Sequence, residues 1–126
     1  MNNVIEIRLA EQIQLDQVRL GMLYSQLGEA GAEAVVCRAM EEIAARLAQC
    51  EELWRAQNHT LLRKQARSLI AIADQIGMHR LAQVARDVTL CVDSKDSIAV
   101  TATLSRLLRI GERSLSAIWS MEDLSI

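Results

Sequence analysis

The sequence contains no proline and no phenylalanine, and aromatic residues make up only 2% of its 126 residues. Because aromatic side chains favour strands and proline marks tight turns, their scarcity excludes a sheet-rich domain. No apolar run approaches the roughly 18 residues of a membrane span, and the first residues lack the apolar stretch of a signal peptide. We therefore expect a helical protein of the cytoplasm that does not enter a membrane.

Cysteine is also sparse. Cys37, Cys50 and Cys91 are odd in number, widely spaced and set among apolar residues. This pattern favours reduced core residues over a disulfide framework or a zinc site. Apolar residues make up 51% of the chain and charged residues 24%, with a formal net charge of −2. That balance is typical of one globular domain and argues against a nucleic-acid partner, which basic surfaces attract.

Apolar residues recur at spacings of three and four, which indicates amphipathic helices. Five helices separated by short breaks are predicted, over residues 7–26, 32–53, 58–76, 78–92 and 95–119. The first has the weakest apolar stripe, and loops of two to five residues between the others favour antiparallel neighbours. The predicted fold is a single all-α domain over residues 1–126, an antiparallel up-down four-helix bundle with an additional N-terminal capping helix.

Local signals mark the predicted boundaries. Gly28 ends the first helix, Asn58 is the N-cap of the third, Gly77 ends the third in a left-handed conformation, and Ser94 caps the last. The positions expected to face the core are Val36, Met40, Ile43, Leu47, Cys50 and Trp54; Leu62, Ala66, Leu69, Ala73 and Ile76; Leu81, Val84, Ala85, Val88 and Cys91; and Val100, Leu104, Leu107, Leu108, Gly111, Leu115 and Ile118.

The common signatures of enzymes are missing from the sequence. It has no Gly-rich phosphate loop, no Glu-x-x-His pair for a di-metal bundle and no G-x-S-x-G elbow. Only two histidines are present, without further ligands at helical spacing, so neither a metal nor another cofactor is expected. The stretch 81–108 lacks the turn glycine of a helix-turn-helix motif, which again argues against DNA binding.

The segment from residue 66 to 81 resembles the signature of histidine-containing phosphotransfer (HPt) domains, and the likeness extends over roughly residues 20–119. The matching positions are Ala66, Ser68, Leu69, Ala73, Ile76, Gly77 and Leu81. The resemblance implies a four-helix bundle that works in two-component phosphorelay signalling. The partner that it implies is the receiver domain of a response regulator or a histidine kinase.

The resemblance fails at the chemistry of the family. Arg67 stands where the family carries its phosphoryl-accepting histidine, Ile70 replaces the lysine one turn on, and Ala71 replaces the neighbouring glycine. A neutral imidazole has a nucleophilic nitrogen, whereas a guanidinium has no acceptor lone pair. We therefore expect a non-catalytic module that binds its partner without carrying phosphate.

The outward strip of the third helix is the predicted docking face for a receiver, whose phosphorylation pocket is a cluster of carboxylates. Cations on this strip suit such a pocket, and Ile70 is expected to be an exposed apolar contact. The predicted face consists of Arg63, Lys64, Arg67, Ile70, Ala71 and Asp74.

Two alternatives stay open at this point. In the first alternative, the chain is an active phosphotransfer protein that uses His59 or His79. The plainer interpretation of both histidines is that each is a polar surface residue at the start of a helix. His59 follows the Asn58 cap, and His79 lies beside Gly77. Otherwise the chain is an unrelated structural or dimerisation bundle. Its sequence is compatible with a monomer or a homodimer.

Overall fold

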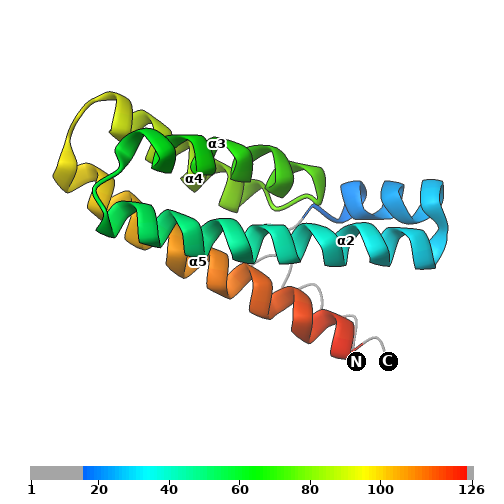
Figure 1. Ribbon diagram of the computed structural model, residues 1–126. Helices are drawn as coiled ribbons and strands as arrows, with labels where there is room; N and C mark the ends of the chain where they lie inside the picture. The colour runs from blue at the N-terminus through cyan, green and yellow to red at the C-terminus, as the bar shows by residue number, and fades with distance from the viewer. Residues whose placement is uncertain (1–15, 125–126) are drawn as a thin grey trace.

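The computed structural model describes residues 16–124, and these residues form four helices and no strand. The helices are α2 (Gln17–Arg55), α3 (His59–Gln75), α4 (His79–Asp93) and α5 (Ser97–Leu124). The all-α fold class predicted from the periodicity is thus confirmed. Each short connection turns the chain back on itself (Figure 1). Helix α3 packs against α2 and α4, and α5 packs against α4 and α2, so the four helices enclose one core.

The predicted break between the first two helices is reduced to a single residue. Gly28 adopts φ 74° and ψ 171° inside α2, and the chain reverses there into a helical hairpin (Figure 1). Gly28 was predicted as the stop, but the helix resumes at once and includes Gly31, so residues 27–31 form no loop. One glycine in the left-handed region is enough to turn the chain. We call residues 16–27, from the N-cap Asp16 to this turn, the N-terminal arm; residues 7–15 of the predicted first helix lie outside the described residues.

The other helix ends follow the predicted capping residues with one correction. The Asn58 side chain accepts a hydrogen bond from Leu61 N at 3.2 Å, and Gly77 has φ 80° after α3. Asp96, not Ser94, caps α5, since its Oδ1 accepts from Ile98 N and Ala99 N at 3.1 Å each. Ser94 instead closes α4, donating from Oγ to the Cys91 carbonyl oxygen. Helix α5 continues to 124 because residues 120–124 contain neither glycine nor proline to end it at 119.

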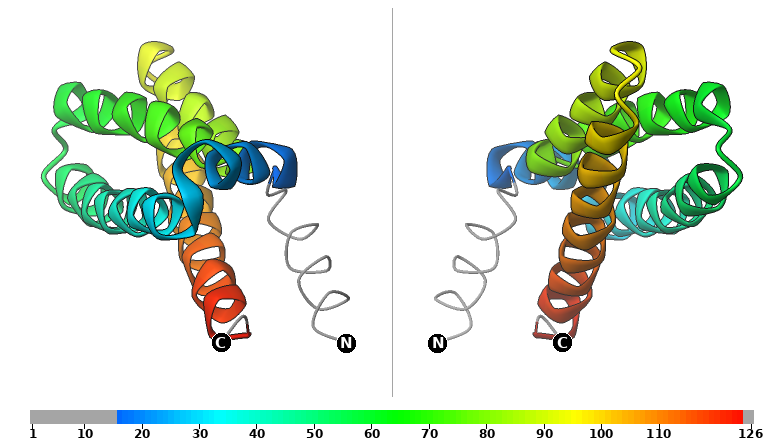
Figure 2. Two further views of the ribbon diagram at one scale, coloured as in Figure 1. Left: turned by 90° about the vertical axis from the view of Figure 1, so that its right-hand side faces the viewer. Right: turned by 90° about the vertical axis from the view of Figure 1, so that its left-hand side faces the viewer.

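The predicted core positions line the inside of the bundle. Most are completely buried, and Leu69 has no exposed surface. The exceptions are half-buried side chains that pack against the core from its edge: Trp54, Cys91, Leu108 and Leu115. Gly111 lies where α5 crosses α2, and a Cβ there would collide with Leu47. Figure 2 shows α5 crossing the other helices obliquely, and the missing side chain at 111 permits this close crossing.

Candidate functional site

The predicted docking face lies on α3, opposite the residues that α3 buries. Lys64, Arg67 and Ala71 are exposed, as the helical period predicts for positions away from the core. The Lys64 and Arg67 side chains form no hydrogen bond or ion pair with any residue in the described range 16–124. Their charges are therefore available to a partner.

Arg63 lies on the side of α3 that faces α4, and the structure pairs it with a residue 30 positions away. Its Nε and Nη2 donate to the two carboxylate oxygens of Asp93 at 2.6 and 3.0 Å. These hydrogen bonds raise the pKa of Arg63 and lower the pKa of Asp93. The pair ties the start of α3 to the end of α4, so Arg63 is less available to a partner than Lys64 or Arg67.

Ile70 corrects the sequence prediction. It was expected to be an exposed apolar side chain, but it is half-buried and packs against the hydrophobic core. The helical period places Ile70 on the same flank of α3 as Arg63 and Asp74, which bond to Asp93 and Arg86 of α4, so this flank is the one that faces the neighbouring helix. The apolar periodicity of a single helix distinguishes inward from outward positions, but it does not determine how deeply residues on the flanks are buried.

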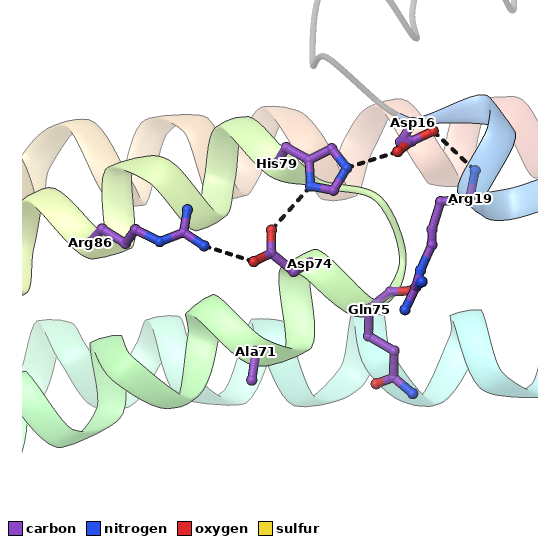
Figure 3. A pocket seen from close by; sticks show the side chains of 7 residues that line it. All are labelled: Asp16, Arg19, Ala71, Asp74, Gln75, His79 and Arg86. Atoms are coloured by element: carbon purple, nitrogen blue, oxygen red, sulfur yellow. Dashed lines mark hydrogen bonds and ion pairs between the residues drawn. The ribbon is translucent and has the colours of Figure 1, made fainter.

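Asp74, the last residue of the predicted face, belongs to a charged network centred on His79 (Figure 3). His79 Nδ1 lies 3.0 Å from Asp74 Oδ1, and His79 Nε2 lies 2.9 Å from Asp16 Oδ2. Arg86 Nη2 donates to the other oxygen of Asp74 at 2.8 Å. The network thus joins the residue before α2, the last turn of α3 and two turns of α4.

The protonation state of His79 follows from this geometry. Carboxylates only accept hydrogen bonds, so both ring nitrogens can donate at once only when the imidazole is doubly protonated. The hydrogen bond to Asp16, followed by the one to Asp74, raises the pKa of His79 above 6.5. The pKa of Asp16 is lowered, first by the backbone hydrogen bond from Arg19 N and then by the one from His79. The two carboxylates therefore favour the imidazolium form of His79 over the neutral ring.

The backbone of the N-terminal arm is anchored beside this network. Asp16 N donates to Gly77 O at 2.8 Å, and Arg19 Nε donates to Gln75 O at 3.1 Å. Gly77 makes the first contact possible, because a Cβ there would lie 2.9 Å from the Asp16 Cβ and 3.0 Å from its carbonyl oxygen. The closest approach of the arm to the α3–α4 turn thus depends on a residue without a side chain.

The same residues line an open cleft of about 620 Å³. Its walls consist of Asp16, Arg19, Ala71, Asp74, Gln75, His79 and Arg86 (Figure 3). Within residues 16–124 no group of three or more histidine, cysteine or acidic side chains is arranged to hold a metal ion. Asp16 and Asp74 bond to different nitrogens of His79, and Arg86 bonds to Asp74. The four side chains therefore form a linear series of polar contacts in the order Asp16, His79, Asp74 and Arg86.

Sequence reasoning missed this network. His79 was interpreted as a polar surface residue and is indeed half-exposed, but it has two partners. Asp16 and Arg86 were not singled out, and no local pattern links Asp16 to a residue 63 positions later. The Asp74–His79 spacing across Gly77 was the one available signal. His59, the other histidine considered, is half-buried in the first turn of α3.

No family model, curated protein or solved structure matches this chain. None of the helices in residues 16–124 combines the length and apolar character of a membrane-spanning segment.

Proposed function

We propose that this chain is a non-catalytic protein-binding module of the HPt type, which docks a response-regulator receiver or a histidine kinase without carrying phosphate. In this proposal the helices form the antiparallel up-down bundle of that family, and the segment before Gly28 is its capping helix. The cyclic packing of α2, α3, α4 and α5 supports this arrangement, as does the reversal of the chain at each short connection (Figure 1).

Arg67 is the observation that carries the proposal. It stands at the position of the phosphohistidine in the HPt signature, it is exposed, and it has no bonding partner among residues 16–124. A guanidinium offers five donors in a planar fork that matches carboxylates, and a receiver's phosphorylation pocket is rich in carboxylates. Lys64, nearly one turn earlier, adds a second available charge. Ala71, one turn after Arg67, is exposed and adds little bulk beside it. The docking contact is therefore centred on these three residues rather than on Arg63 or Ile70.

The same geometry argues against phosphate transfer. Arg67 has no lone pair to attack a phosphoryl group. Both nitrogens of His79 are engaged with carboxylates, so in this geometry neither is free to attack a phosphoryl group. Negative charge from Asp16 and Asp74 would also repel an incoming phosphoryl group. His59 is the remaining histidine, and incubation with a phosphorylated receiver shows whether it accepts phosphate.

The proposal is tested by titrating the protein against purified receiver domains and histidine kinases encoded by the same genome. A charge-assisted hydrogen bond contributes about 1.5–3 kcal/mol, so Arg67→Ala is expected to weaken binding roughly ten- to a hundred-fold. Lys64→Ala should mainly lower the association rate and its salt dependence. Arg109→Ala is the matched control, because Arg109 is exposed on α5 and forms no ion pair among the described residues. Calorimetry should show that the Arg109→Ala variant binds the partner with the affinity of the wild type.

Equal affinities of the wild type and Arg67→Ala would contradict the docking role of Arg67. Failure to bind any receiver or kinase would contradict the module itself and favour a structural bundle. Incubation with a phosphorylated receiver should leave no acid-labile phosphate on this chain. Phosphate that appears and is lost in His59→Ala or His79→Ala would instead establish a phosphotransfer protein.

A further inference from the structure

The first residues of the N-terminal arm are held on the α3–α4 turn by polar contacts. Leu20 packs against the hydrophobic core, but Val18, Met22 and Leu27 are exposed. At the far end of the arm, a Cβ on Gly28 would meet nothing within 4 Å. The polar anchors at Asp16 and Arg19 are therefore a large part of what holds the arm on the α3–α4 turn.

We propose that His79, clamped between Asp16 and Asp74, is a pH-operated latch for the N-terminal arm. In its closed state the imidazolium donates to Asp16 at the start of the arm and to Asp74 on α3, and so bridges two segments far apart in sequence. Loss of one proton leaves the ring a single N–H donor. A neutral ring can keep only one carboxylate as a partner, and the other then faces an imidazole lone pair. Asp74 and His79 both belong to the α3–α4 turn, so the arm opens by loss of the Asp16 contact.

The charged groups around His79 come from every element at this site. Asp16 precedes α2, Arg19 lies on α2, Asp74 on α3 and Arg86 on α4. Arg86 binds the second oxygen of Asp74, and Arg19 donates to a backbone carbonyl, so neither arginine is hydrogen-bonded to the ring. The two carboxylates are the direct partners of His79. Their negative charge favours its protonated form.

The direction of the pH effect follows from the two shifted groups. The pKa of His79 is raised from 6.5. Its contribution to the stability of the closed arm is therefore complete below 6.5 and is lost as the pH rises through the raised pKa. The pKa of Asp16 is lowered from 3.8, so its contribution to the same stability is present above 3.8 and is lost as the pH falls through the lowered pKa. The latch is tightest from about pH 4 to 6.5 and opens on the alkaline side.

Amide hydrogen exchange at residues 16–27, from pH 5.5 to 8.5 and corrected for intrinsic rates, tests the latch. Protection of the arm should fall as the pH rises through the midpoint of His79, so it should be lower at pH 8.5 than at pH 5.5. Amides around Leu69 in α3 should stay protected in the same samples, which also shows that the bundle is folded. An NMR titration of the His79 ring should give a midpoint above 6.5 that coincides with the loss of protection.

Three variants separate the latch from a general pH effect. His79→Gln removes the titrating group and should abolish the pH dependence of arm protection, whereas His59→Gln should preserve it. Asp16→Asn should lower the midpoint of the His79 ring titration. Arm protection that stays constant across the range in the wild type, or that falls equally in His79→Gln, would overturn the proposal.

Discussion

Helix α3 and the N-terminal arm are both helical, yet they are held to the molecule by opposite means. Helix α3 buries Leu62, Ala66, Leu69 and Ala73 completely. The arm exposes most of its large apolar side chains and is tied down at Asp16 and Arg19 by hydrogen bonds. A continuous apolar stripe thus fixes a helix independently of pH. A segment without such a stripe needs polar contacts, and one of these, between Asp16 and His79, responds to protonation of the imidazole.

Removal of an apolar side chain from α3 should have the largest effect on the free energy of unfolding. Leu69 is completely buried, so Leu69→Ala is expected to cost about 2–5 kcal/mol, because transfer free energy is lost and a cavity remains. Leu90→Ala on α4 is the matched control, since Leu90 is 63% exposed. Urea denaturation followed by circular dichroism measures both. Similar losses for the two variants would contradict the assignment of the core.

Substitution of the two glycines with positive φ, Gly28 and Gly77, distinguishes the cost of backbone strain from the loss of the contact between the arm and the α3–α4 turn. A left-handed conformation costs a residue with a side chain about 1–2 kcal/mol, so Gly77→Ala and Gly28→Ala should both carry strain at their positions. Only the Cβ at position 77 would also collide with the Asp16 backbone. Gly77→Ala should therefore additionally expose the amides of residues 16–27 to hydrogen exchange. Full protection of the arm in that variant would show that the Asp16–Gly77 contact does not hold it.

A polar substitution on the arm should have the smallest effect. Val18 is 75% exposed, so Val18→Ser is expected to change the free energy of unfolding by less than about 0.5 kcal/mol. Thermal denaturation compared with the wild type is sufficient to measure it. A loss above about 1 kcal/mol would show that this side of the arm is covered, for example by a second copy of the chain.

Local residue patterns predicted most of the helical frame. The three-four spacing identified the buried positions of α3, and Asn58 and Gly77 marked its two ends correctly. Such signals act within one or two turns, where the chemistry of a single side chain decides the backbone. The cap of α5 was misassigned because Ser94 and Asp96 are both good capping residues. Lys95 at φ 57° places Asp96 at the start of the helix.

The candidate site was less predictable than the helices. The exposure of Arg67 and Lys64 followed from the period of α3, because both point directly away from its buried stripe. Arg63 and Ile70 lie on the flank of the same helix, and their environments depend on α4. No periodicity in α3 indicates that Asp93 meets Arg63 from 30 residues away.

Local residue patterns were enough to predict that residues 16–124 are built from helices, which side of each helix is buried, and that Lys64 and Arg67 are exposed cations on α3. The packing of the helices was needed to place His79 between Asp16 and Asp74, to pair Arg63 with Asp93 and to cover part of Ile70. The difference lies in the range of the interactions. Hydrophobic periodicity and capping are properties of neighbouring residues, whereas ion pairs between helices form only after packing has brought distant charges within a few ångströms.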